Sequence, residues 1–145
     1  MSQNWLITGA GRGFGRAFVS AAAESGAEVY AGVRHVPEGD PLFHSPRVHP
    51  LIFDVTKPGE VNAAVEKALG EAGHIDVLIN NAGFGMSGAF EEMSDEELRG
   101  LMEADYYGVV NVTRAILPSM RGRRSGTFLN VASQGGLTGF SGSSA

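Results

Sequence analysis

The sequence predicts an α/β protein with a doubly wound parallel sheet. Short apolar runs alternate along all 145 residues with segments whose apolar residues recur at helical spacing. Most of these runs contain few polar residues, as expected of strands that helices cover on both faces. A glycine-rich turn separates the first apolar run from the first helical pattern. We therefore expect a single domain over residues 1–145, with strand order 3-2-1-4-5 for the part present.

The chain up to residue 53 predicts three strands and one helix. Asn4 to Thr8 is a short apolar run, which predicts a buried strand. The helix after the glycine turn is expected to end near Ser25, with Gly26 as its cap, and its apolar spacing comes from Phe14, Ala17, Phe18 and Ala21. Residues 28–33 and 48–53 are expected to form the next two strands. The proline-rich stretch between them is expected to be a loop or a broken helix.

The rest of the chain predicts two helices and two strands. Thr56 is placed to cap, and Pro58 to open, a helix whose apolar face is Val61, Val65, Ala68, Leu69 and Ala72. Residues 75–79 follow as the fourth strand. Ser94 and Glu97 predict a capping box at the start of a long helix that runs towards Pro118. Residues 126–132 are expected to form the fifth strand, before a tail rich in glycine and serine.

Composition excludes several classes of function. A net charge of −5 argues against binding to a phosphate backbone, so a nucleic-acid partner is not expected. No apolar run approaches the roughly 20 residues of a membrane span, and the start of the chain has no secretory signal pattern. With no cysteine, the chain has no disulfide framework, and we expect no metal site. These features predict a cytoplasmic protein without membrane contact, whose partner is a small molecule.

The turn after the first strand carries a pattern suited to binding phosphate. Residues 8–15 read Thr-Gly-Ala-Gly-Arg-Gly-Phe-Gly, a G-x-x-x-G-x-G spacing that differs from the G-x-G-x-x-G of other dinucleotide folds. Glycines let a pyrophosphate approach backbone N–H groups at the positive end of the following helix. A merely tight turn between strand and helix would show the same glycines. The residues expected to meet a cofactor here are Gly9, Arg12, Gly13, Phe14 and Gly15.

Three further motifs follow the predicted third, fourth and fifth strands. Asp54 comes after the third strand, Asn80-Asn81-Ala82-Gly83 after the fourth, and the segment from Asn130 to Ser133 after the fifth. Ligands of parallel sheets bind outside the carboxyl ends of the strands, which is where these motifs lie. Together with the glycine turn, they resemble the short-chain dehydrogenase/reductase family. The resemblance runs through all 145 residues in the correct order.

This resemblance implies a Rossmann fold and an oxidoreductase that transfers a hydride between NADP(H) and a carbonyl or secondary alcohol substrate. By the same resemblance, Asp54 and Val55 would meet the adenine, and Ser133 would orient the reacting oxygen of the substrate. The ribose and the nicotinamide side of the cofactor would lie against Asn81, Ala82 and Gly83.

The end of the second predicted strand favours NADP(H) over NAD(H). Proteins that select NAD place a carboxylate there, where it holds the 2′-hydroxyl of the ribose. Here the position is Val33, and Arg34 follows it. A carboxylate would repel a 2′-phosphate, whereas an arginine can bind it through a charge-assisted hydrogen bond.

The tyrosine and lysine that the resemblance leads us to expect are missing. The family's Tyr-x-x-x-Lys motif would begin one position beyond Ala145, and neither Tyr30, Tyr106 nor Tyr107 has a lysine four residues later. We therefore expect a chain truncated just before this motif and inactive alone. Its fifth strand would be an apolar sheet edge that favours association of this chain with others. For the complete protein, the resemblance implies a homo-oligomer, because the long helix from Ser94 often packs between subunits in this family.

Asp105 departs from the family pattern and is a candidate catalytic residue. It falls on the apolar stripe of the long helix, where a buried carboxylate would be costly unless paired. The family usually has asparagine at the position that matches Asp105 in Asp105-Tyr-Tyr-Gly108, and that asparagine helps a water relay. An ionised aspartate cannot donate a hydrogen bond. Asp105 therefore either keeps the relay role or serves as a structural acceptor.

Two rival functions remain open from the sequence. One is a non-catalytic NADP(H)-binding or regulatory module, which the missing tyrosine makes a real alternative. The other is a methyltransferase, because that class also has a glycine-rich first turn. The motif at Asn80 to Gly83 and the segment from Asn130 to Ser133 argue against the methyltransferase. The sequence does not identify the substrate.

Overall fold

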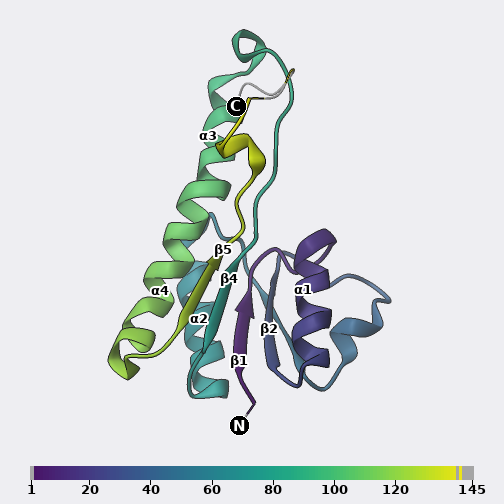
Figure 1. Ribbon diagram of the computed structural model, residues 1–145, viewed down its shortest axis with the longest axis vertical. Helices are drawn as coiled ribbons and strands as arrows, with labels where there is room; N and C mark the ends of the chain where they lie inside the picture. Colours follow the sequence, from purple (N-terminus) through teal and green to yellow (C-terminus); the bar gives the residue numbers. More distant parts are fainter. Residues whose placement is uncertain (1, 140, 142–145) are drawn as a thin grey trace.

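The computed structural model describes residues 2–139 and residue 141. That part of the chain holds a parallel sheet with strand order β3-β2-β1-β4-β5 (Figure 1). The strands are β1 (Asn4–Ile7), β2 (Glu28–Val33), β3 (Val48–Ile52), β4 (Val77–Asn80) and β5 (Thr127–Asn130). The predicted α/β class, the parallel sheet and the strand order are therefore confirmed.

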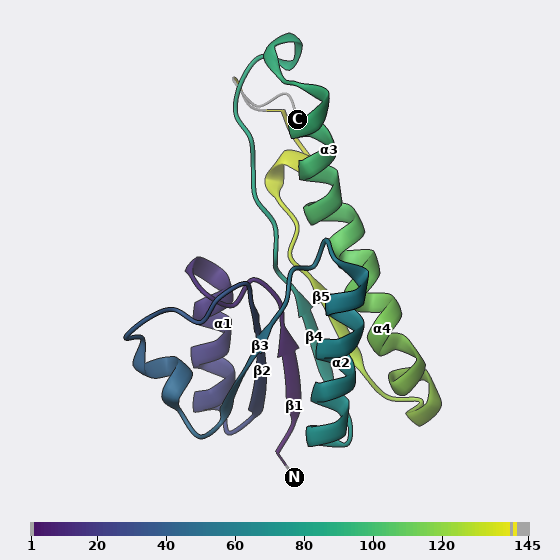
Figure 2. The ribbon, with the colours of Figure 1, turned by 180° about the vertical axis from the view of Figure 1, so that it is seen from behind.

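Helices cover both faces of this sheet, as Figure 2 shows from behind. Helix α1 (Gly13–Glu24) lies on one face, with a short 3-10 helix, η1 (Pro41–His44), beside it. Helices α2 (Pro58–Ala72) and α4 (Gly108–Arg123) lie on the other. Each face has its own apolar core, and Val19 of α1 and Val112 of α4 are both fully buried in these cores. This double cover explains why the strand sequences are almost uniformly apolar.

The register of the central strand aligns the carboxyl ends of its neighbours. Leu6 in β1 stands opposite Tyr30 in β2 and Leu78 in β4, so the three strands end at one edge of the sheet. The turns that follow these strands therefore meet at that edge, where doubly wound folds bind their ligands. This edge is the upper end of the sheet in Figure 1, and α3 (Asp95–Met102) extends beyond it.

Of the two helix caps predicted from the sequence, the one at α3 is confirmed and the one at α2 is wrong. The capping box is confirmed, because the Ser94 hydroxyl accepts the Glu97 N–H while the Glu97 carboxylate accepts the Ser94 N–H. Thr56 does not cap α2. Lys57 is the N-cap residue, and the Thr56 hydroxyl instead donates to a carboxylate oxygen of Asp54 at 2.8 Å.

The long helix is longer than predicted and is interrupted. Between α3 and α4, residues Glu103–Tyr107 form a π-helical turn, and α4 continues past Pro118 to Arg123. Pro118 is exposed, so water can satisfy the carbonyl that its missing N–H leaves free. None of the helices in the described part of the chain is long and apolar enough to cross a membrane.

The predicted burial of Asp105 is wrong. Asp105 is exposed, and its neighbour Ala104 is the buried residue of the π-helical turn. A π-turn adds a residue to the helical repeat, so the residues within and before it do not continue the 3.6-residue stripe that follows it. The stripe therefore misplaces Asp105, while Val112 and Ile116 further along are buried as expected.

Candidate functional site

A cavity of about 870 Å³ opens at the carboxyl ends of the strands. Its walls come from the turns that follow β1, β2, β3 and β4, which the sheet brings together. Ten of the residues expected from the sequence to bind a cofactor line it, namely Gly9, Arg12, Gly13, Phe14, Arg34, Asp54, Val55, Asn81, Ala82 and Gly83. Gly15 is not part of the lining, because it is buried behind the turn.

Two positions of the first turn must be glycine, because other backbone atoms lie too close to them for a side chain to fit. Gly9 has φ +63°, and a Cβ atom on it would lie 2.7 Å from the Cα atom of Ala82 in the turn after β4. A Cβ atom on Gly15 would collide with the carbonyl oxygen of Gly9. The first contact fixes the two turns against each other, and the second seats the start of α1 on the glycine turn.

Thr8 ties the same two turns together and was not among the residues predicted for the site. It is 2% exposed at the end of β1, and its hydroxyl oxygen accepts the backbone N–H groups of Asn81 and Ala82, each at 3.0 Å. The Asn81 side chain donates two more hydrogen bonds in the same direction, to the carbonyl oxygens of Thr8 at 3.1 Å and Gly9 at 3.2 Å. The only signal in the sequence was a threonine directly before Gly9.

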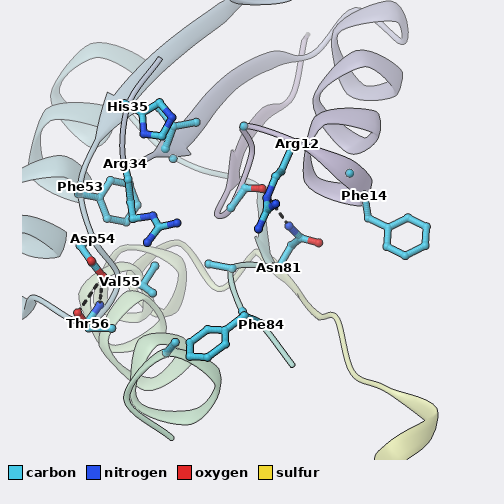
Figure 3. A pocket seen from close by; sticks show the side chains of 18 of the residues that line it. Arg12, Phe14, Arg34, His35, Phe53, Asp54, Val55, Thr56, Asn81 and Phe84 are labelled. Carbon is cyan, nitrogen blue, oxygen red and sulfur yellow. Dashed lines mark hydrogen bonds between the residues drawn. The ribbon is translucent and has the colours of Figure 1, made fainter. Parts of the chain in front are cut away.

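Two arginines project into the cavity from opposite walls. Figure 3 shows Arg12, from the glycine turn, and Arg34, from the end of β2, reaching into the same space, whereas the Phe14 ring points away from it. Both arginines are exposed. Neither forms an ion pair with any described residue. Their charges are therefore free to attract an anion into this part of the cavity.

Asp54 supplies the carboxylate that lines this cavity, and Thr56 in the same turn donates hydrogen bonds to it. Thr56 donates to one Asp54 oxygen through its backbone N–H at 2.9 Å and through its hydroxyl at 2.8 Å. Burial acts to raise the pKa of Asp54, but these hydrogen bonds and the charges of Arg34 and Lys57 together lower it. Asp54 thus stays ionised at neutral pH while the turn, rather than Arg34, satisfies its oxygen.

A second cavity of about 550 Å³ lies next to the first. The two share the residues from Asn81 to Phe84 together with Val131, so they form adjoining parts of one cleft. Both residues predicted to act in catalysis, Ser133 and Asp105, line the second cavity. The larger cavity above the sheet therefore adjoins a smaller one that is lined by both candidate catalytic residues.

Ser133 follows β5 and is exposed to the second cavity. Its hydroxyl oxygen accepts the backbone N–H of Gly135 at 3.1 Å, which holds the side chain at the start of the short 3-10 helix Gln134–Gly136. This bond uses the hydroxyl as an acceptor. Its proton remains available for donation to an oxygen in the cavity.

Asp105 contacts the turn after β4 from the π-helical turn. Its Oδ1 atom accepts the backbone N–H of Phe84 at 3.0 Å, and a Cβ atom on Gly83 would lie 2.8 Å from that oxygen. Gly83 therefore permits the close approach of the carboxylate. An asparagine oxygen could accept the same N–H, so this contact does not require a charge at position 105.

Asn80 is a second residue that the sequence did not single out by itself. It is 3% exposed, and its side-chain amide donates to Asn130 at 2.9 Å and to Thr113 at 3.2 Å. These bonds join β4, β5 and α4 next to the second cavity. Because Asn130 is three positions before Ser133, the network fixes the strand end that carries the serine.

Comparisons with known proteins agree with this geometry. The model of the protein family described as short chain dehydrogenase matches residues 3–145. A 3-ketodihydrosphingosine reductase from Bacteroides thetaiotaomicron is 42% identical over 134 residues, which cover 92% of this chain and 48% of that protein. A 3-oxoacyl-(acyl-carrier-protein) reductase from Thermotoga maritima is 34% identical, over 92% of this chain and 56% of that protein.

Solved structures show the same likeness. A short-chain dehydrogenase from Streptomyces avermitilis superposes with a TM-score of 0.92 at 40% identity, covering 98% of this chain and 53% of that one. The protein ElxO, solved with NADP bound, superposes with a TM-score of 0.91 at 28% identity, covering 99% of this chain and 60% of that one. The chain thus spans about half the length of the relatives it matches.

Proposed function

Because this chain belongs to the short chain dehydrogenase family, we propose that it is the cofactor-binding part of an NADP(H)-dependent oxidoreductase. The reaction proposed is hydride transfer between NADP(H) and a carbonyl or secondary alcohol. Two relatives carry the names of reductases of 3-keto and 3-oxo compounds, which supports a keto group as the reacting part of the substrate.

The observation that carries the choice of cofactor is that Arg12 and Arg34 have no ion-pair partner among the described residues. They face one cavity from two walls, and the position at the end of β2 is Val33 rather than a carboxylate. A ribose 2′-phosphate is a dianion that arginine binds through charge-assisted hydrogen bonds. One oxygen of the neighbouring Asp54 accepts two hydrogen bonds from Thr56, and Asp54 forms no ion pair with Arg34, so the Arg34 guanidinium can bind the phosphate.

The first turn also fits the pyrophosphate of a dinucleotide. Helix α1 has no acidic residue in its first turn, and no side chain caps its N-terminus. Its first N–H groups therefore have no partner within the helix, and they lie at the positive end of the helix dipole, where Gly13 and Phe14 line the cavity. Gly9 and Gly13 leave the approach to them open. This arrangement supports binding of phosphate at the turn.

In the proposed reaction, the bound nicotinamide would supply or accept the hydride. Ser133 would orient the substrate oxygen in the second cavity by donating its hydroxyl proton, a contact that strengthens as negative charge develops on that oxygen. Asp105 would hold the turn from Asn81 to Phe84 that separates the cofactor from this space. Its further role in a proton relay is part of the proposal.

Titration of the intact protein with NADPH and NADH tests the cofactor. We expect NADPH to bind more tightly, and Arg34→Ala to reduce its affinity by roughly ten- to a hundredfold, because one charge-assisted hydrogen bond contributes about 1.5 to 3 kcal/mol. Arg47→Ala is the matched control, since Arg47 is equally charged but is paired with Glu28 away from the cavity. Equal affinities for the two cofactors, or equal effects of the two substitutions, would contradict the proposal.

A further inference from the structure

We propose that Arg16 and Asp40 form a latch that holds residues 35–42 against α1 and thereby positions the cavity wall next to Arg34. Both would be positioning residues for the 2′-phosphate end of the cofactor, without touching it. This inference rests on the proposed function for its effect on binding.

Arg16 and Asp40 form a bidentate ion pair. Arg16 Nε donates to one Asp40 oxygen at 2.6 Å, and Arg16 Nη2 donates to the other at 2.9 Å. The Asp40 side chain is only 15% exposed, compared with 43% for Arg16. A bidentate pair of this kind fixes orientation as well as distance, which separates it from ordinary surface ion pairs.

Asp40 is also the residue that organises the segment after β2. Its Oδ1 atom accepts the Leu42 N–H at 3.0 Å, so it caps the short helix η1. Phe43 in that helix is 6% exposed and packs in the core beneath α1. Within the segment between buried Val33 and buried Phe43, Asp40 is the side chain that forms the attachment to α1 by hydrogen bonds, while Leu42 packs against the core beneath that helix.

The residues held by this attachment form part of the cofactor cavity. His35 and Pro37 line it next to Arg34. Pro37 also lies close to the glycine turn, because a Cβ atom on Gly11 would be 3.7 Å from its ring. Arg16 is one helical turn from Arg12, to whose carbonyl oxygen it donates its backbone N–H at 3.2 Å. The latch thus joins the two walls from which Arg12 and Arg34 project.

The latch and an effect of charge alone predict opposite changes in anion affinity for Asp40→Asn. Arg16→Met removes a positive charge near the phosphate site, whereas Asp40→Asn removes a negative one and frees Arg16. If only charge mattered, the first would weaken anion binding and the second would strengthen it. If the latch matters, both weaken binding, because the binding-competent arrangement of the segment becomes less populated. Asp40→Asn keeps an oxygen that can cap η1.

The binding experiment uses adenosine 2′,5′-bisphosphate, which carries the 2′-phosphate and no nicotinamide. We expect Arg16→Met and Asp40→Asn each to reduce its affinity for the intact protein by about three- to tenfold, by calorimetric titration. Arg16→Lys, which keeps the charge but not the two-point contact, should weaken binding by less than Arg16→Met. Arg47→Met is the matched control, because Arg47 is similarly exposed and pairs with Glu28 instead; it should leave affinity unchanged.

Hydrogen exchange of the protein without ligand gives an independent readout. The backbone amides of residues 36–42 should exchange faster in both Arg16→Met and Asp40→Asn, and at the unsubstituted rate in Arg47→Met. Tighter binding by Asp40→Asn, or unchanged exchange in the two latch variants, overturns the latch. If the unsubstituted protein does not bind the bisphosphate, the proposed cofactor is wrong, while the exchange rates still decide whether the pair holds the segment.

Discussion

Asn81 donates two hydrogen bonds to Thr8 across the base of the cleft, one from its backbone and one from its side chain. The Thr8 hydroxyl oxygen accepts the Asn81 backbone N–H at 3.0 Å, and the Asn81 side-chain amide donates to the Thr8 carbonyl oxygen at 3.1 Å. The turns after β1 and β4 are therefore held as one unit. Any ligand that lies over both turns meets a surface whose two halves are already in place, which lowers the ordering cost of binding.

Replacing Thr8 with valine should lower the free energy of unfolding by about 1 to 3 kcal/mol. Valine keeps the shape of the side chain but leaves the N–H groups of Asn81 and Ala82 without their acceptor. Thr8→Ser retains the oxygen and serves as the control. Urea unfolding of the two variants gives the comparison, and equal stability of Thr8→Val and Thr8→Ser would show that the hydroxyl is not needed.

The Arg16–Asp40 pair should give the protein a pH-dependent contribution to stability. The hydrogen bond from Arg16 is the main reason that the pKa of Asp40 falls to about 2, below its ordinary 3.8. A carboxyl whose pKa is lowered in the folded state stabilises the fold above its unfolded pKa and loses that effect as pH falls through the folded value. The stability difference between the unsubstituted protein and Asp40→Asn should thus be constant above about pH 5 and shrink between about pH 4 and 2. A difference that does not change with pH in urea unfolding would contradict this.

Asp105→Asn should leave the fold intact, with a change in stability within about 0.5 kcal/mol. The exposed carboxylate has no cationic partner among the described residues, and an asparagine oxygen can accept the Phe84 N–H in its place. Removing the charge therefore neither relieves a buried charge nor breaks an ion pair. Asp105→Ala, which removes the acceptor, is the control and should be the less stable of the two. A large drop in melting temperature of Asp105→Asn would reveal a requirement for the carboxylate.

The sequence predicted what depends on local pattern and regular spacing. The strand order, the two helical layers and the capping box at Ser94 follow from apolar periodicity and cap chemistry. Ten of the expected cofactor residues meet in one cavity because they follow parallel strands, whose carboxyl ends share an edge. Residues placed by strand ends are thus predictable even when they are far apart along the chain.

What the sequence missed depends on contacts between distant segments or on irregular backbone. The π-helical turn at Glu103–Tyr107 has no periodic signal, so the apolar stripe carried Asp105 to the wrong face. Thr8 and Asn81 are 73 positions apart, and nothing local shows that their hydrogen bonds connect two turns. The pairing of Arg16 with Asp40 likewise requires the segment after β2 to fold back onto α1.

Ser133→Ala in the intact protein should reduce the turnover number while leaving the affinity for NADPH unchanged. The hydroxyl lines the second cavity rather than the first, so its contact would be with the substrate oxygen. A hydrogen bond that strengthens in the transition state affects turnover more than ground-state binding, and the loss of one such donor costs about a hundred- to a thousandfold. Steady-state kinetics and cofactor titration separate the two effects, and an unchanged turnover number would refute the role.

A polypeptide of residues 1–145 should not oxidise NADPH in the presence of ketones. Proton transfer to the substrate oxygen needs an acid within hydrogen-bond reach, and tyrosine is the acid that the family resemblance implies. Tyr30 is 4% exposed and packs in the core with α2 and α4. Tyr106 and Tyr107 are exposed, and their rings pack edge to face with centroids 5.1 Å apart. None of the three lines the second cavity with Ser133. NADPH oxidation followed by absorbance, with sedimentation to establish that the polypeptide is folded and dispersed, tests this, and steady turnover would show that another group serves as the acid.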